Sequence, residues 1–104
     1  MIRKVHKDEF AQAIASGTVL VDFYGNTCIP CKMYAKELEQ AVFDMPFLEI
    51  VKVCSDEDPE ILSQYDVMAV PTTLIFHEGE LVERFTGMKP ADDVKELMSS
   101  YIYG

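Results

Sequence analysis

The sequence predicts an α/β fold in which a mixed five-stranded sheet lies between two layers of helices. Apolar, β-branched runs alternate with segments of helical periodicity along the front of the chain, a pattern typical of parallel strands joined by crossover helices. Two further strand-like runs lie close together near the end, separated by a tight turn, and such a hairpin adds antiparallel strands. Since the chain has 104 residues, of which 49% are hydrophobic, we expect residues 1–104 to form a single domain with a substantial core.

The first half of the chain predicts strands and helices in alternation. A short strand at 2–5 precedes a helix at 7–15, whose apolar residues share one face and which ends at a Ser-Gly pair. The run at 19–24 is apolar and β-branched with one acid inside it, which suits a strand covered on both faces of a sheet. A helix follows over 30–44, because proline suits the first helical turn and the next proline, Pro46, lies just beyond the predicted end.

The second half predicts the remaining elements. A strand at 48–54 is followed by a short helix at 60–65. Strands at 72–76 and 81–86 flank a Glu-Gly-Glu turn and form the hairpin. The segment 91–102 carries apolar residues at offsets of 0, 3, 4, 7 and 8 positions, which makes it the clearest amphipathic helix of the chain. The resulting order is β-α-β-α-β-α-β-β-α.

The charge of the chain limits the partners it can bind. A net charge of −9 argues against nucleic acid, because phosphate binding requires clustered Lys and Arg. No apolar run approaches the roughly 18 to 20 residues that span a membrane, and residues 3–9 are charged where a signal peptide needs its apolar stretch. We therefore expect a cytoplasmic protein that binds neither nucleic acid nor membrane. The acidic patch at 56–60 is interpreted as a solvated loop leading into a helix, or as a docking surface for a basic partner.

The run Cys28-Ile29-Pro30-Cys31 is either a redox dithiol or half of a tetrahedral metal site. Zinc would require two more ligands, and no second Cys or His pair exists, since His6 and His77 are isolated in the sequence. The predicted strand, turn and helix place Cys28 at a helix N-terminus, where free N–H groups and the helix dipole stabilise a thiolate. These features favour the redox interpretation, with no metal and no cofactor other than the Cys28–Cys31 disulfide.

The redox interpretation assigns a role to each cysteine and to one acid. Cys28 attacks a substrate disulfide, a mixed disulfide forms, and Cys31 then attacks Cys28 to release the reduced substrate. The second attack requires Cys31 to lose a proton. Asp22 is the candidate acceptor, because burial within an apolar strand raises the pKa of a carboxyl group. An Asp22 that faces water at a sheet edge is the alternative interpretation.

These residues resemble the thioredoxin family, in which the pattern Cys-Ile-Pro-Cys is an atypical active site. The matching segments occur in the family's order and cover nearly all of the chain: 21–24, 28–32, 51–53, 65–67, 70–72, Phe76, Gly79 and 85–87. The resemblance implies the thioredoxin fold and a monomeric thiol–disulfide oxidoreductase. Its implied partners are disulfide-containing client proteins and an electron donor of the thioredoxin reductase type.

The resemblance also implies roles for residues outside the cysteine motif. Asp22 matches the family's buried acid, Lys52 matches the lysine that tunes it, and Pro71 matches a cis-proline beside the active site. The backbone of Val70 would pair with an extended segment of the substrate. The remaining substrate-binding residues implied by the resemblance line an apolar groove around Cys28: Thr27, Ile29, Pro30, Ala69, Thr86, Gly87 and Met88.

The chain departs from the family's pattern at several positions. Ile29 stands where the family usually has Gly, Thr27 and Tyr24 stand where it has Trp, and Lys36 replaces a helix proline. Ile29 and the missing Trp predict an altered choice of partner, so a dedicated electron carrier for one reductase and one client is the first alternative function. A non-catalytic interaction or metal-binding module is the second. Because proline kinks helices, Lys36 predicts a straighter helix than the family's.

Cys54 is the third cysteine and lies outside the motif, at the end of the strand predicted over 48–54. One interpretation is a small buried hydrophobic residue, and the other is a regulatory thiol near the active-site end of the sheet.

Overall fold

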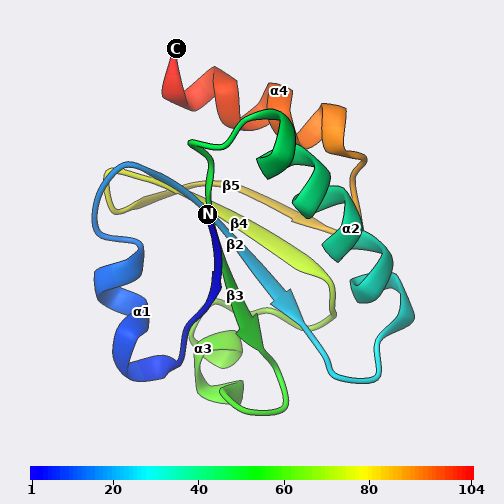
Figure 1. Ribbon diagram of the computed structural model, residues 1–104. Coiled ribbons are helices and arrows are strands. Elements are labelled where there is room, and N and C mark those ends of the chain that lie inside the picture. The colour runs from blue at the N-terminus through cyan, green and yellow to red at the C-terminus, as the bar shows by residue number, and fades with distance from the viewer.

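The computed structural model describes all residues 1–104 and confirms the predicted order of elements (Figure 1). The helices and strands are β1 Ile2–Lys4, α1 Lys7–Ala13, β2 Thr18–Tyr24, α2 Ile29–Asp44, β3 Glu49–Cys54, α3 Pro59–Gln64, β4 Thr72–His77, β5 Glu80–Thr86 and α4 Ala91–Ile102. None of these helices contains an apolar stretch of membrane-spanning length.

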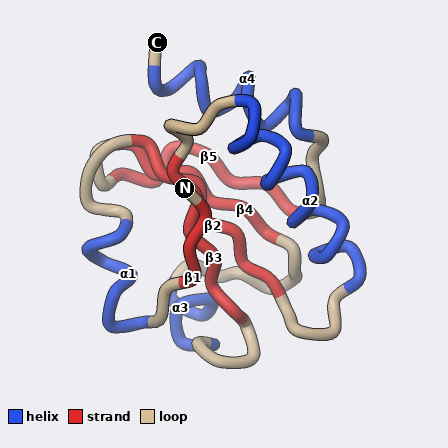
Figure 2. Tube along the Cα trace, viewed as in Figure 1, coloured by secondary structure: helices blue, strands red, loops and turns tan.

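The five strands form one mixed sheet in the order β1-β3-β2-β4-β5, which is the thioredoxin fold predicted from the sequence (Figure 2). β3 pairs in parallel with both β1 and β2, whereas β4 is antiparallel to β2 and to β5. Glu78 and Gly79 make the turn between β4 and β5 with φ values of 51° and 83°. Two consecutive residues with positive φ form the tight turn whose twist matches a hairpin.

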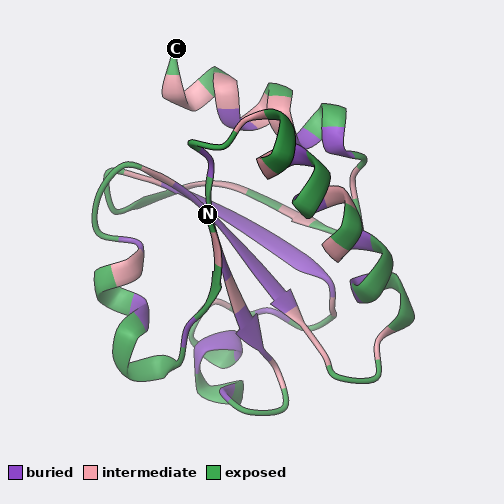
Figure 3. Cartoon of the chain, viewed as in Figure 1, coloured by how far each residue is buried: buried purple, intermediate pink, exposed green.

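Helices cover both faces of the sheet and divide the core in two (Figure 1). Along β2, Val19, Val21 and Phe23 point to the layer that contains α1 and α3, while Leu20 points to the layer that contains α2 and α4. Side chains alternate between the two faces of a strand, so a strand that is buried on both faces is apolar throughout. The central strands are accordingly the most buried part of the chain (Figure 3).

Several predicted boundaries were wrong by one or two residues. α1 ends at Ala13 rather than at 15, β1 ends at Lys4, and β5 begins at Glu80. α3 begins at Pro59 because proline, which has no N–H, fits the first helical turn. α2 is continuous past Lys36, and its straightness relative to the family stays a prediction.

The acidic patch at 56–60 is only partly solvated. His6, which is isolated in the sequence, pairs with a residue of this patch in the fold. Asp58 is buried, accepts a hydrogen bond from the backbone N–H of Lys7 at 3.1 Å, and pairs with Nδ1 of His6 at 2.9 Å. Lys4 forms an ion pair of 2.7 Å with Glu57. His6, Glu57 and Asp58 are close enough to share a metal ion, but their oxygens already bind these donors of the N-terminal segment. The cluster therefore ties the N-terminus to the start of α3.

Candidate active site

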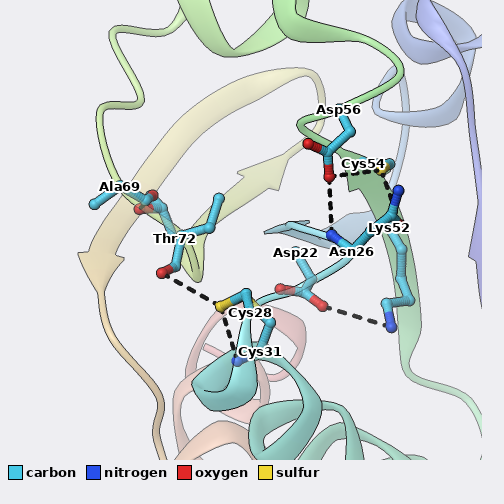
Figure 4. Close-up of a disulfide and its surroundings, with 10 residues drawn as sticks. Asp22, Asn26, Cys28, Cys31, Lys52, Cys54, Asp56, Ala69 and Thr72 are labelled. Atoms are coloured by element: carbon cyan, nitrogen blue, oxygen red, sulfur yellow. Dashed lines mark hydrogen bonds and ion pairs between the residues drawn. A yellow bond between two sulfur atoms is a disulfide. The ribbon is translucent and has the colours of Figure 1, made fainter.

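The cysteine pair lies where β2 ends and α2 begins. Cys28 is the N-terminal cap of α2, Cys31 is in its first turn, and the two form a disulfide with a Cα–Cα distance of 5.2 Å. The backbone N–H of Cys31 donates a hydrogen bond of 3.2 Å to Sγ of Cys28 (Figure 4). Cys28 is partly exposed, whereas Cys31 is buried. The helix terminus thus supplies a donor to the outer sulfur, which favours its thiolate after reduction.

Two other segments come to the same end of the sheet. Sγ of Cys28 lies 3.7 Å from the carbonyl oxygen of Val70, and the peptide bond from Val70 to Pro71 is cis. The backbone N–H of Gly87 donates a hydrogen bond of 2.8 Å to the carbonyl oxygen of Pro71, and Thr86 pairs with Thr72 across the hairpin. The loop before β4 and the end of β5 therefore lie beside the disulfide.

Most of the side chains predicted to line the groove are accessible. Pro71 is buried, and Val70 and Gly87 are partly exposed, while the exposed positions are Thr27, Ile29, Pro30, Ala69, Thr86 and Met88. Met68, which sequence reasoning missed, is 93% exposed next to Ala69. No sequence signal identifies Met68, because its exposure is visible only in the structure.

Asp22 lies in the middle of the sheet rather than at a water-facing edge, so the alternative interpretation of this residue was wrong. Its side chain is buried, and neither carboxylate oxygen has a hydrogen-bond partner. Nζ of Lys52 lies 4.0 Å from Oδ2 of Asp22, and Figure 4 shows the carboxylate between this lysine and the cysteine pair. Burial raises the pKa of Asp22 to about 6, and the charge of Lys52 partly offsets that increase. The carboxyl group can therefore take up or release a proton near neutral pH.

A cavity of ≈ 160 Å³ lies between the start of α2 and β3. Its walls include Cys31 and Ala35 from α2, Tyr24 and Asn26 from the end of β2 and the loop after it, and Lys52 from β3. The volume and the polar groups suffice for water next to the ammonium group of Lys52, whereas Cys31 itself is only 3% exposed.

Comparison with known proteins agrees with this geometry. The family model for thioredoxin matches residues 1–100 of the chain. The chain belongs to the thioredoxin family. A thioredoxin from Chlamydia trachomatis is 40% identical over 101 residues, which cover 97% of this chain and 99% of that protein. A thioredoxin from Staphylococcus epidermidis is 36% identical over 102 residues, with 97% of this chain and 98% of that protein covered.

Solved thioredoxin structures have the same fold. A thioredoxin from Halobacterium salinarum superposes with a TM-score of 0.84 at 32% identity and covers 97% of this chain and 90% of its own. A chloroplastic thioredoxin z superposes with a TM-score of 0.88 at 28% identity, and the match covers 99% of this chain and 96% of that one. Thioredoxins are protein disulfide oxidoreductases that act through a redox-active disulfide without a cofactor. This chain is accordingly a thiol–disulfide oxidoreductase that uses Cys28 and Cys31.

Tyr34 is a buried neighbour of this thioredoxin site that sequence reasoning missed. Its hydroxyl oxygen lies 2.8 Å from Oγ1 of Thr73, the residue opposite Asp22 in the pairing of β2 with β4. Burial raises the pKa of Tyr34 far above neutrality, so its hydroxyl stays protonated. Its place in a helical apolar row of α2 gave no signal that distinguished it from core packing.

Cys54 lies near this end of the sheet, as expected, and is fully buried. Its Sγ lies 3.5 Å from Oδ1 of Asn26 and 3.9 Å from Oδ2 of Asp56, and the same Asp56 oxygen accepts the backbone N–H of Asn26 at 2.9 Å. These contacts join the loop before α2 to the end of β3. The burial suits a packing role for the thiol, and its regulatory role stays a prediction.

Reducing the Cys28–Cys31 disulfide is expected to lower the free energy of unfolding by about 2 kcal/mol. The bond closes a loop with a sequence separation of 3, and the entropy removed from an unfolded chain is small for so short a loop. Thermal unfolding with and without reductant at pH 7 should show a drop in Tm of roughly 10 °C. An unchanged Tm for the reduced protein would contradict this estimate, and a Cys28→Ser/Cys31→Ser variant supplies a control that reductant does not affect.

Proposed function

We propose that Cys28 is the attacking cysteine of this oxidoreductase and that Cys31 resolves the mixed disulfide. The difference in exposure supports these roles, since Cys31 is 3% exposed and only Cys28 is open to a large client. The Cys28 thiolate, stabilised by the N–H of Cys31, attacks one client sulfur and displaces the other as a thiolate. The difference in exposure between Cys28 and Cys31 is the observation that carries the proposal.

Asp22 accepts the proton that Cys31 must lose before the second attack. Its raised pKa and its place between Lys52 and the cysteine pair support this role (Figure 4). The Cys31 thiolate then attacks Sγ of Cys28, the bond between Cys28 and the client breaks, and the client sulfur leaves as a thiolate. The client has gained two electrons, and the Cys28–Cys31 bond has formed again.

The client binds as an extended segment along the loop before β4. The carbonyl group of Val70, 3.7 Å from Sγ of Cys28, supports backbone pairing at that point, next to the buried Pro71. The side chains that surround this segment are Thr27, Ile29, Pro30, Ala69, Thr86, Gly87 and Met88.

The physiological context follows from the family. Thioredoxins reduce disulfides of client proteins and receive electrons from thioredoxin reductase, and we infer the same type of donor for this chain. The protein acts in the cytoplasm as a monomer of one domain and has no metal, nucleic-acid or membrane partner. The net charge of −9 supports the part of this description that concerns nucleic acid, because phosphate binding requires clustered Lys and Arg.

A dedicated carrier is the second candidate function. Ile29 is 70% exposed immediately beside Cys28, so every partner must accommodate a β-branched side chain next to the reacting sulfur. A large exposed apolar side chain at the reaction centre favours a partner with a matching recess.

Trapping of clients by a Cys31→Ser variant tests both candidates. Without the resolving thiol, Cys28 is expected to remain joined to its clients as mixed disulfides that a reductant releases. A Cys28→Ser/Cys31→Ser variant is the control, and it should trap nothing because Cys54 is buried. Many trapped proteins would support the general reductase, and a single trapped protein would support the dedicated carrier. Trapping of clients through Cys31 in a Cys28→Ser variant would show that the roles of the two cysteines are reversed.

A further inference from the structure

The Lys52 ammonium group lies between a carboxylate and an aromatic ring. Its Nζ is 4.0 Å from Oδ2 of Asp22 and 4.6 Å from the centroid of the Tyr24 ring. Asp22 and Lys52 are opposite each other in the pairing of β2 with β3, and Tyr24 follows Asp22 by two positions on the same face of β2. The three side chains therefore meet on one face of the sheet, the face covered by α2.

The stem of Lys52 is largely buried, but its ammonium group has no other ion-pair partner than Asp22. No hydrogen bond from the Lys52 ammonium group is present, and its side chain is 24% exposed beside the cavity of ≈ 160 Å³ that Cys31 also lines. An ammonium group is strongly hydrated and sits on a flexible stem, so it moves into water unless it is held. The face of an aromatic ring attracts a cation within about 6 Å of its centroid. The face of the Tyr24 ring is thus placed to keep the charge near Asp22, in addition to the attraction of the carboxylate when it is ionised.

We propose that Tyr24 is a positioning residue for thiol–disulfide exchange, because its ring holds the Lys52 ammonium group beside the Asp22 carboxylate. The proposal rests on the proton-accepting role of Asp22 stated above. The phenolic oxygen has no part in it, since the contact is made through the face of the ring. A phenylalanine at position 24 therefore preserves the effect, and an aliphatic side chain of similar bulk removes it.

The surroundings of Asp22 explain why the place of this one charge matters. Lys52 of β3 is the cation that faces the carboxylate. α2 contributes Cys31 and Tyr34, both uncharged in the oxidised protein, and the neighbour on β4 is the neutral Thr73. If the ammonium group moves away by about 2 Å, it attracts the ionised carboxylate less strongly. At an effective dielectric constant of about 20, this loss raises the pKa of Asp22 by about one unit.

The test measures the titration of the Asp22 carboxyl group by carbon NMR in the oxidised protein, where Cys28 and Cys31 do not ionise. Tyr24→Leu is expected to raise the midpoint by about 0.5 to 1 pH unit, and Tyr24→Phe to leave it within about 0.2 unit. In a Lys52→Met background, Tyr24→Leu should cause no further shift, because the cation is already gone. Tyr24→Met replaces the leucine variant if that variant does not fold.

Two results would overturn the proposal. One is an unchanged Asp22 midpoint in Tyr24→Leu. The other is an Asp22 shift of the same size in the Lys52→Met background, because such a shift would be a purely structural effect. The pH profile of disulfide reduction by the same variants separates this proposal from the role of Asp22. If both the titration and the acid limb of the rate move to higher pH, both proposals stand. If the titration moves and the rate profile does not, Tyr24 positions Lys52 but Asp22 is not the proton acceptor.

Discussion

Asp22→Asn is expected to raise the free energy of unfolding by about 3 kcal/mol at pH 8 and by much less at pH 4. The carboxyl group is fully buried, its oxygens have no hydrogen-bond partner, and burial raises its pKa from 3.8 to about 6. In the unfolded chain the group is solvated and titrates near its ordinary value. The folded state therefore binds the proton more tightly than the unfolded state does, and ionisation above pH 6 destabilises the fold.

The sign of this effect is specific to a raised pKa. The stabilisation is fully present below about pH 4 and is lost as the pH rises through about 6. Asparagine is neutral throughout, so the difference between variant and wild type should grow over this interval. Urea unfolding of the oxidised proteins between pH 4 and pH 8 measures it, with the exposed Asp93→Asn as a matched control. A difference that does not change with pH would show that the carboxyl group is not destabilised by burial.

Cys28→Ser is expected to lower the rate of protein disulfide reduction by at least about 1,000-fold. A serine hydroxyl does not ionise near neutral pH, so the donor from Cys31 at the helix terminus has no thiolate to stabilise. The other thiols cannot replace it, because Cys31 is buried behind Cys28 and Cys54 is fully enclosed.

Reduction of insulin disulfides in the presence of a chemical reductant measures this loss. Cys54→Ala is the matched control, since it removes a cysteine outside the reacting pair and should keep the rate within about twofold if the enzyme remains folded. More than about one hundredth of the wild-type rate in Cys28→Ser would contradict the assignment of the attacking group.

Local patterns were sufficient to predict most of the fold. The run in β2 is apolar because the strand is buried on both faces, and the apolar stripe of α4 packs against α2 and the sheet. Cys28 could be placed at a helix N-terminus because a strand, a turn and a helix follow one another within a few residues. α1 and α3 were predicted to end too late because a helical hydrogen bond continues past each end, from the N–H of Ile14 to Phe10 and from that of Tyr65 to Ile61.

Contacts between distant segments could not be predicted in the same way. His6 and Asp58 are 52 positions apart, and only the packed fold brings the loop after β1 to the start of α3. The contact of Lys52 with the Tyr24 ring depends in the same way on the pairing of β2 with β3. Met68 is another such case, because its exposure follows from the path of the loop before β4.

The alternation of side chains along β2 also limits how the length of this strand can vary. Phe23 faces the layer of α1 and α3, while its neighbour Asp22 faces the layer of α2 and the cysteines. A single inserted or deleted residue within β2 would exchange the two faces beyond that point and turn the carboxylate away from Lys52. Relatives that conserve the chemistry should therefore differ in β2 by substitution only, and accommodate gains and losses of residues at surface turns such as Glu78–Gly79.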